Sequence, residues 1–250
     1  MALETYTQTI EGRSPNGPNI FPARGSRRFI VGVDLGQASD PTAICVLEHA
    51  KVPSTKWTVR ERECAPPTKT QQIEERFDVR HLQRLPLGMS YPDVAQDVAD
   101  MLARPPLSGL ATLVVDETGV GRAVADIFDT AGMKPKRVSI TAGNEQSVAG
   151  QDRFHVAKGI LISTLDARLH TGELKFAKDL REAETMRDEL KDFRRKVSAA
   201  GRYSYEARVG KHDDLVLACA IALWWACRPP PPQWGIGTYE WVPEMGLVVG

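Results

Sequence analysis

The chain has 250 residues, of which 42% are hydrophobic and 26% are charged, and its 32 basic residues are balanced by 32 acidic ones. This length and composition exclude a wholly disordered chain and predict one compact domain, or at most two small ones, with a sizeable core. Zero net charge also excludes a uniformly basic nucleic-acid coat, because phosphate binding needs basic residues clustered on one face.

The first part of the chain is expected to be an arm followed by an antiparallel meander. Residues 1–27 contain Gly, Pro, Asn, Ser and Arg without periodicity, which predicts a flexible N-terminal arm. Three short strands separated by turns are predicted next, at 28–36, 41–48 and 57–64. Strands joined by such turns favour an antiparallel arrangement.

From residue 90 onward the hydrophobic period changes to that of helices and buried strands. Ser90 and Pro92 open an amphipathic helix that ends near residue 103, and 110–116 is the continuous apolar run of a buried parallel strand. Further helices are predicted at 121–131, 156–170, 180–196 and 213–227, and further strands at 137–141, 173–177 and 202–208. A loop is predicted at 142–151. We therefore expect an α/β domain over 28–227, with a mixed five-stranded sheet flanked by helices, and a Pro-rich tail at 228–250.

Neither the cysteines nor the apolar segments indicate secretion or a membrane. The four cysteines, at 45, 64, 219 and 227, form no Cys-x-x-Cys pair and are expected to be small core residues in a reducing compartment. The first residues lack the basic and apolar regions of a signal peptide, and the longest apolar run, 215–227, is too short to span a membrane. We expect a soluble, cytoplasmic protein.

Acidic residues stand where three predicted elements begin or end. Asp34 closes the first strand, Asp116 closes the strand after the first helix, and Asp213 and Asp214 open the last helix. If the two strands are parallel neighbours, Asp34 and Asp116 emerge at the edge of the sheet where ligands of α/β sheets bind. Crowded carboxylates repel one another unless a cation neutralises them, and oxygen ligands favour Mg²⁺ or Mn²⁺ over zinc. Two such ions, about 3.5 to 4 Å apart, can hydrolyse a phosphodiester.

Each acid also has a purely structural explanation. Asp34 is suited to a turn, Asp116 to local hydrogen bonds in a strand-to-helix loop, and Asp213 or Asp214 to the N-cap of a helix. The presence of all of them at element ends in one α/β chain favours the acidic metal site over these separate explanations.

Three motifs contain these acids and carry a resemblance to a known family. They are Val31-Gly-Val-Asp-Leu-Gly36 with the following Asp40-Pro-Thr-Ala, then Val114-Val-Asp-Glu-Thr-Gly-Val-Gly121, and finally Gly210-Lys-His-Asp-Asp-Leu-Val-Leu-Ala218. In these motifs the chain resembles the nuclease domain of the large terminase subunit of tailed phages, a member of the RNase H-like superfamily related to RuvC-type resolvases. The resemblance runs from about Phe29 to Trp225.

The resemblance implies an RNase H-like fold and a metal-dependent endonuclease that cuts concatemeric double-stranded DNA during viral DNA packaging. It implies catalytic roles for Asp34, Asp116 and Asp214, with Asp34 bridging two Mg²⁺ or Mn²⁺ ions and the other two holding one ion each. Asp213 is expected to be a second ligand or the helix cap, and Asp40 matches an accessory acid. Strand alternation points Glu117 away from Asp116.

The chain departs from full-length large terminases in lacking a motor signature. No Gly-x4-Gly-Lys-Ser/Thr motif occurs, and Gly119-Val-Gly121-Arg lacks the lysine, so no ATP site is expected. We therefore expect a nuclease module that works with a separate ATPase motor subunit, with a small terminase and a portal as further partners.

The DNA contacts are expected to be phosphate contacts, which position a duplex without reading its sequence. The candidates are Lys158, which opens a helix after the 142–151 loop, Lys211, which borders the Asp pair, and the basic cluster 194–196, which fits a solvated helix face at least as well. Trp224 and Trp225 lie in an apolar helical run and are expected in the core, whereas Trp234 and Trp241 in the tail suit a partner surface.

Other functions stay open at this point. A RuvC-like Holliday-junction resolvase or an RNase H would keep the fold and change the substrate. The Gly32–Gly36 segment also resembles the first phosphate loop of actin-like ATPases, which need a second lobe that 250 residues hardly provide. A non-catalytic packaging scaffold, in which the acids are only caps, predicts no metal dependence.

Overall fold

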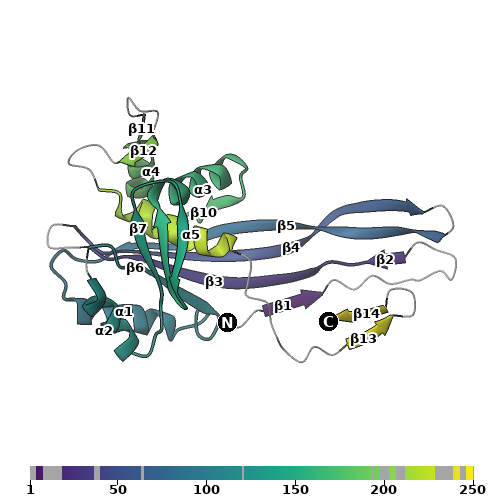
Figure 1. The fold of residues 1–250 in the computed structure, drawn as a ribbon, viewed down its shortest axis with the longest axis horizontal. Coiled ribbons are helices and arrows are strands. Elements are labelled where there is room, and N and C mark those ends of the chain that lie inside the picture. The colour runs from purple at the N-terminus through teal and green to yellow at the C-terminus, as the bar shows by residue number, and fades with distance from the viewer. Residues whose placement is uncertain are drawn as a thin grey trace.

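The computed structural model describes residues 4–7, 19–36, 40–62, 65–119, 121–192, 194–197, 203–206, 212–228, 239–242 and 246–249. A ten-stranded mixed sheet forms the centre of the molecule (Figure 1). Its strands are β1 (Glu4–Thr7), β2 (Asn19–Phe21), β3 (Arg24–Asp34), β4 (Ala43–Arg62), β5 (Ala65–Arg84), β6 (Ala111–Asp116), β7 (Lys136–Thr141), β8 (Gln146–Gly150), β9 (Arg153–Ala157) and β10 (Leu174–Phe176).

Within the described residues, five helices flank this sheet and two short hairpins accompany it. The helices are α1 (Tyr91–Leu102), α2 (Gly121–Thr130), α3 (Lys158–His170), α4 (Ala183–Asp192) and α5 (Asp214–Cys227). The hairpins pair β11 (Arg194–Val197) with β12 (Tyr203–Glu206), and β13 (Tyr239–Val242) with β14 (Gly246–Val249).

The order of the strands puts the ends of β3 and β6 side by side. The path through the sheet is β10-β5-β4-β3-β6-β7-β9-β8, and β1 and β2 pair with β3 and β5. The neighbours β3, β4 and β5 are antiparallel, whereas β6 runs parallel to β3 and β7 parallel to β6. The predicted mixed sheet is present, with β3, β4, β6 and β7 at predicted strands and β5 in place of the strand predicted at 57–64, and the remaining strands enlarge it beyond the expected five.

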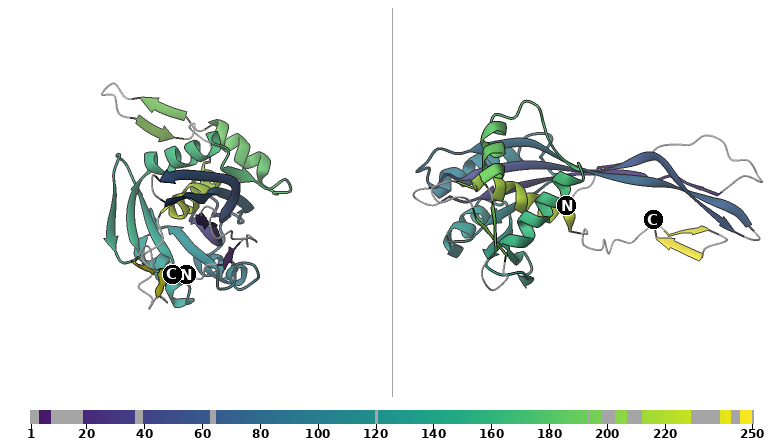
Figure 2. Two further views of the ribbon diagram at one scale, coloured as in Figure 1. Left: turned by 90° about the vertical axis from the view of Figure 1, so that its right-hand side faces the viewer. Right: turned by 90° about the horizontal axis from the view of Figure 1, so that it is seen from above.

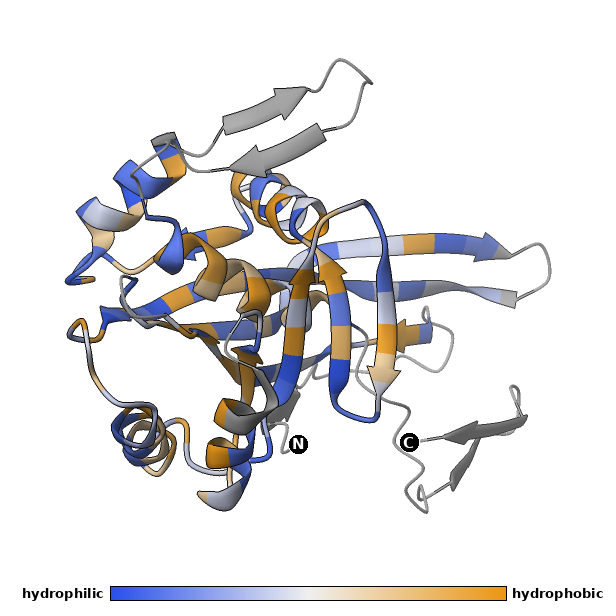
Figure 3. Ribbon diagram, turned by 60° about the vertical axis from the view of Figure 1, so that its left-hand side comes forward, coloured by the Kyte–Doolittle hydropathy of each residue, from blue (hydrophilic) through white to orange (hydrophobic). Residues whose placement is uncertain are grey.

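Helices cover the two faces of the sheet with two separate apolar cores. On one face, α3, α4 and α5 pack on the strands around Phe77, Leu161 and Met186. On the other face, α1 and α2 pack on β3 and β6 around Val98 and Phe128 (Figure 1). Most residues of α5 and many residues of the central strands are hydrophobic, whereas the outer part of the β4–β5 hairpin is mostly hydrophilic (Figure 3).

Helix α5 lies directly on the backbone of β3. All its residues from Asp214 to Ala226 are buried. A Cβ atom added at Gly32 in β3 would lie 2.1 Å from the carbonyl oxygen of Ala218 and 2.9 Å from Cβ of Ala222. Ala218 and Ala222 are one helical turn apart, so small residues on both elements allow the close approach. This contact fixes the distance between the end of β3 and the start of α5.

The long β4–β5 hairpin was not expected, and it corrects the predicted third strand. Residues 57–62 of the segment predicted at 57–64 belong to the outer half of β4, residues 63–64 lie outside the described chain, and the third strand of the meander is instead β5, at Ala65–Arg84. The outer half of the hairpin extends beyond the helices, and the short β2 pairs with β5 there (Figure 2). Most of its side chains are exposed, and even Val59 and Ile73 are about half exposed.

Smaller corrections concern the segment after β7. The predicted loop 142–151 contains β8, which forms a hairpin with β9. The predicted helix 180–196 ends at Asp192, and Arg194–Val197 is strand β11. The helices predicted at 91–103, 121–131, 156–170 and 213–227 are confirmed to within about two residues.

The predicted arm and tail are described only in short pieces. Within 1–27, β1 pairs with β3 and β2 pairs with β5, and β3 itself begins at Arg24. Trp234 in the tail lies outside the described residues. No helix in the described part of the chain is both long and apolar enough to cross a membrane.

Candidate active site

Three elements bring the predicted acids to one end of the sheet. Asp34 and Asp116 are the last residues of β3 and β6, and they are direct partners in the parallel register of these strands. Neighbouring strands are about 4.8 Å apart, so the two carboxylates leave the sheet side by side. Asp214 is the first residue of α5, whose close contact with Gly32 sets it near Asp34.

The electrostatic environment of Asp34 shows how closely the acids gather. Burial raises the pKa of Asp34 well above its ordinary value, and the charges of Asp116, Asp214 and Asp213 raise it further. Lys158 acts in the opposite direction and lowers this pKa. The charges of the other three predicted metal ligands therefore reach Asp34, and this repulsion favours a bound cation.

Thr118 holds the carboxylate of Asp116. Its hydroxyl and its backbone N–H both donate to Oδ1 of Asp116, at 2.5 and 2.8 Å. Burial raises the pKa of Asp116, and these two hydrogen bonds lower it. The neighbouring Glu117 is oriented toward β7 and β9, where it accepts a hydrogen bond from Ser139 at 3.0 Å and pairs with Arg153 at 3.4 Å.

The two acids at the start of α5 have different partners. Asp213 occupies the N-cap position, but its side chain makes no capping hydrogen bond within the described chain. Instead, its Oδ2 accepts a hydrogen bond from Nζ of Lys158 at 2.6 Å. The Oδ2 atom of Asp214 lies 3.3 Å from Nη2 of Arg84 and 3.9 Å from Nδ1 of His212. Burial raises the pKa of Asp214, and Arg84 and His212 lower it.

Asp40 reaches the rim of the site through His212. Nδ1 of His212 lies 3.3 Å from Oδ1 of Asp40, and the charge of Asp40 raises the pKa of Asp214. The turn after β3 returns closely on itself, because a Cβ atom at Gly36 would lie 2.0 Å from the carbonyl oxygen of Asp40. A glycine is therefore required there for Asp40 to lie near the other acids.

Sequence reasoning missed two residues beside the site, the half-buried Arg84 and the buried Glu189. Arg84 ends β5, and its guanidinium forms an ion pair with Glu189 of α4. Burial raises the pKa of Glu189 to about 7, although the backbone N–H of Val216 and the charge of Arg84 both lower it. Arg84 and Glu189 are 105 residues apart in the chain, so no local sequence pattern predicts that they pair. Only recognition of β5 as a strand would have pointed to Arg84.

The basic and aromatic candidates have mixed outcomes. Lys158 lies beside Asp213, Lys211 lies outside the described residues, and 194–196 belongs to β11, of which only the backbone is described. Trp224 and Trp225 are buried against Phe154, which confirms their expected place in the core.

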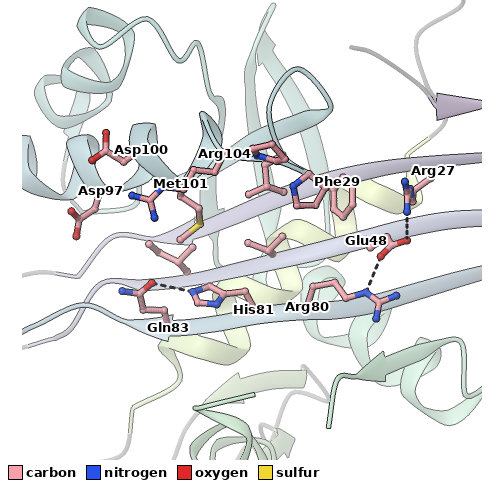
Figure 4. A pocket seen from close by; sticks show the side chains of 15 residues that line it. Arg27, Phe29, Glu48, Arg80, His81, Gln83, Asp97, Asp100, Met101 and Arg104 are labelled. Carbon is pink, nitrogen blue, oxygen red and sulfur yellow. Dashed lines mark hydrogen bonds and ion pairs between the residues drawn. The ribbon is translucent and has the colours of Figure 1, made fainter. Parts of the chain in front are cut away.

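A cavity of about 660 Å³ lies apart from the acids, against β3, β4, β5 and the end of α1, and none of the predicted acids lines it (Figure 4). Glu48 in this cavity pairs with Arg27 at 3.9 Å and with Arg80 at 2.8 Å.

The residues present fit divalent cations. No three acidic, histidine or cysteine side chains of the described chain are already gathered tightly enough to enclose an ion. However, Oδ2 of Asp214 is buried and accepts no hydrogen bond from a described residue, although it lies 3.3 Å from Nη2 of Arg84, and Asp34 is surrounded by like charges. Crowded carboxylate oxygens of this kind are the ligands that Mg²⁺ and Mn²⁺ prefer.

The strand order and the flanking helices define an RNase H-like fold, as the sequence motifs predicted. The crystal structure of the large terminase nuclease from thermophilic phage G20c with bound magnesium aligns with a TM-score of 0.53 and 21% identity, over 79% of this chain and 81% of that one. The cobalt-bound form of the same nuclease gives the same values. The chain therefore has the fold of a terminase nuclease.

The sequence is also similar to those of two viral proteins. It is 31% identical over 116 residues to the large terminase subunit of Thermus phage G20c, and equally to that of Thermus virus P23-45. The match covers 46% of this chain and 20% of each relative, so it extends over only about a fifth of their length. No model of a known protein family matches the chain.

Proposed function

We propose that this chain is a divalent-metal-dependent DNA endonuclease that acts in viral DNA packaging, as the nuclease of a terminase. The observation that carries the proposal is the convergence of Asp34, Asp116, Asp213 and Asp214 from three separate elements. The terminase-nuclease fold and the partial likeness to large terminase subunits support the same activity. Its expected substrate is concatemeric double-stranded DNA.

In this proposal the divalent ions would be held by Asp34, Asp116 and Asp214, with Asp213 as a second ligand. When bound, the ions would polarise the scissile phosphate and activate a water molecule for in-line attack. Thr118 keeps one oxygen of Asp116 occupied with two hydrogen bonds and so fixes the direction of the other oxygen.

Lys158 is proposed to neutralise phosphate charge beside the acids. Its ammonium group already contacts Asp213, and about a third of its side chain is exposed, so it can turn toward a nearby phosphate. We propose the same role for Lys211, from its place next to the acidic pair in sequence. A separate ATPase motor subunit, a small terminase and a portal are the proposed partners.

The test is digestion of a supercoiled plasmid with Mg²⁺ or Mn²⁺ by the wild type, Asp34→Asn and Asp214→Asn. We expect both variants to lose cutting by at least about 10²-fold while staying folded. Asp97→Asn, in an exposed acid of α1, is the matched control and should cut like the wild type. Equal cutting by all four proteins would refute the proposal.

Two further substrates separate the alternatives that share this fold. Preferential paired cutting of a four-way junction would indicate a resolvase, and a requirement for an RNA strand would indicate an RNase H. Comparable cutting of linear duplex DNA without either feature supports the terminase activity.

A further inference from the structure

An ion pair between Arg84 and Glu189 adjoins the third acid of the site. Nη2 of Arg84 contacts Oε1 of Glu189 and lies 3.3 Å from Oδ2 of Asp214. Glu189 and Asp214 are buried, whereas the side chain of Arg84 is 23% exposed. A buried carboxylate costs several kcal/mol of desolvation unless it is paired, and the half-buried guanidinium is the cation that lies between these two.

Glu189 also caps the helix that carries Asp214. Its Oε2 accepts a hydrogen bond from the backbone N–H of Val216 at 3.1 Å. This N–H belongs to the first turn of α5, where backbone donors have no acceptor within the helix. Asp213 at the N-cap does not satisfy these donors with its side chain, because it is turned toward Lys158. A residue of α4 therefore performs the capping for α5.

Glu189 thus acts on Asp214 in two ways, through the start of α5 and through the guanidinium of Arg84. The cap from Glu189 sets where α5 begins, and Asp214 is the first residue of that helix. The guanidinium that Glu189 holds then contacts one oxygen of Asp214. Partners of this kind, which orient a ligand without touching the ion, commonly change metal affinity or activity by 10 to 100-fold.

We infer that Arg84 and Glu189 are positioning residues that orient Asp214 toward a divalent cation. This inference rests on the proposed nuclease function. A merely structural ion pair would change the stability of the protein and leave its affinity for the cation unaltered.

The charge of Arg84 allows the two roles to be told apart. A positive group beside acidic ligands opposes the binding of a cation. If Arg84 acted only through its charge, removing it would therefore tighten Mn²⁺ binding. If Arg84 positions Asp214, the variant Arg84→Met should bind Mn²⁺ more weakly instead. The direction of the change therefore distinguishes positioning from a simple charge effect.

The main test uses the double variant Arg84→Met, Glu189→Gln in the full chain. It keeps the net charge of the pair and keeps an oxygen that can accept from Val216, and replacement of a buried ion pair is often neutral for stability. Mn²⁺ affinity is measured by titration calorimetry, and plasmid nicking is followed against Mn²⁺ concentration. We expect affinity to fall at least about tenfold, with cutting largely restored at high Mn²⁺.

Controls make each outcome decisive. Glu184→Gln, an exposed acid of the same helix, should bind Mn²⁺ like the wild type. The inference is overturned if the double variant binds Mn²⁺ within about twofold of the wild-type affinity and Asp214→Asn loses binding in the same assay. If the wild type binds no better than Asp214→Asn, the metal site itself is wrong, and the inference fails with it.

A milder variant covers the case in which the double variant does not fold. Arg84→Lys keeps the charge but lacks the rigid, planar guanidinium whose Nη2 atom lies between Glu189 and Asp214. It should weaken Mn²⁺ binding several-fold, and wild-type affinity in this variant would equally overturn the inference.

Discussion

Replacement of Gly32 by alanine tests whether the approach of α5 to β3 builds the site. The new Cβ atom would lie 2.1 Å from the carbonyl oxygen of Ala218 and 2.9 Å from Cβ of Ala222. Neither contact can be relieved by a side-chain rotation, so α5 must retreat by about 1 Å, and overpacking of this kind typically costs about 1 to 3 kcal/mol of stability. Any gain from restricting the unfolded chain is smaller, about 0.4 to 1 kcal/mol.

The same retreat should separate Asp214 from Asp34. A displacement of about 1 Å in a catalytic group can reduce the rate about 10²-fold, so cutting should fall more than the loss of stability explains. Urea unfolding measures the free energy of unfolding, and plasmid cutting at saturating Mn²⁺ is measured well below the unfolding transition.

Gly150→Ala in β8 is the matched control. There the added Cβ atom would meet only Cβ of Arg153, at an ordinary distance of 3.7 Å, and we expect wild-type stability and activity. If Gly32→Ala also matches the wild type in both measurements, the close contact does not determine the geometry of the site. Lost stability with undiminished cutting would likewise refute the link between α5 and the acids.

Three further predictions concern the network around α5 and the acids. Arg28 donates to the carbonyl oxygen of Ala226 at 2.5 Å near the end of α5 and to His49 at 3.1 Å, so Arg28→Met should lower the free energy of unfolding in urea by about 2 kcal/mol or more. Burial lowers the pKa of His49 to about 4, as do the charges of Arg28 and Lys51. Between pH 6.5 and 4 the unfolded chain therefore binds the proton and the folded chain does not. The free energy of unfolding should decrease by up to about 3 kcal/mol as the pH is lowered through this range. Glu75, which acts in the opposite direction, limits this loss, and His49→Gln should flatten the acid side of a urea-unfolding series. Mn²⁺ at about 100 times its dissociation constant should stabilise the wild type by about 2.7 kcal/mol in a thermal melt and leave Asp34→Asn unchanged.

The parts of the site that sequence could predict are those written in local patterns. Asp34, Asp116 and Asp214 each follow or open an element whose period is clear, and the apolar run of 215–227 is unmistakable as a buried helix. Because parallel strands end at the same edge, the convergence of the first two acids follows from the element order alone.

The parts that could not be predicted depend on contacts between distant segments. The β5 strand was missed because its outer half consists mostly of exposed polar side chains with no hydrophobic period, and Arg84 at its end was missed with it. The pair that Arg84 forms with Glu189 joins residues 105 positions apart. The contact of Gly32 with Ala218 also spans most of the chain, and in sequence each is only a small residue in an apolar segment.

The burial of α5 explains how the fold can hold carboxylates that repel one another. Apart from Asp214, the buried part of the helix is apolar or aromatic, so its transfer from water drives the packing of α5 on β3. That packing carries Asp214 toward Asp34 and Asp116, where burial and like charges raise the pKa values of these acids. A bound cation would relieve the repulsion between these carboxylates, which the packing of α5 holds close together. The affinity for the cation should therefore depend on how tightly α5 packs on β3. Changes far from the acids that loosen α5, including Gly32→Ala and Arg28→Met, should therefore weaken Mn²⁺ binding in the order in which they displace Asp214.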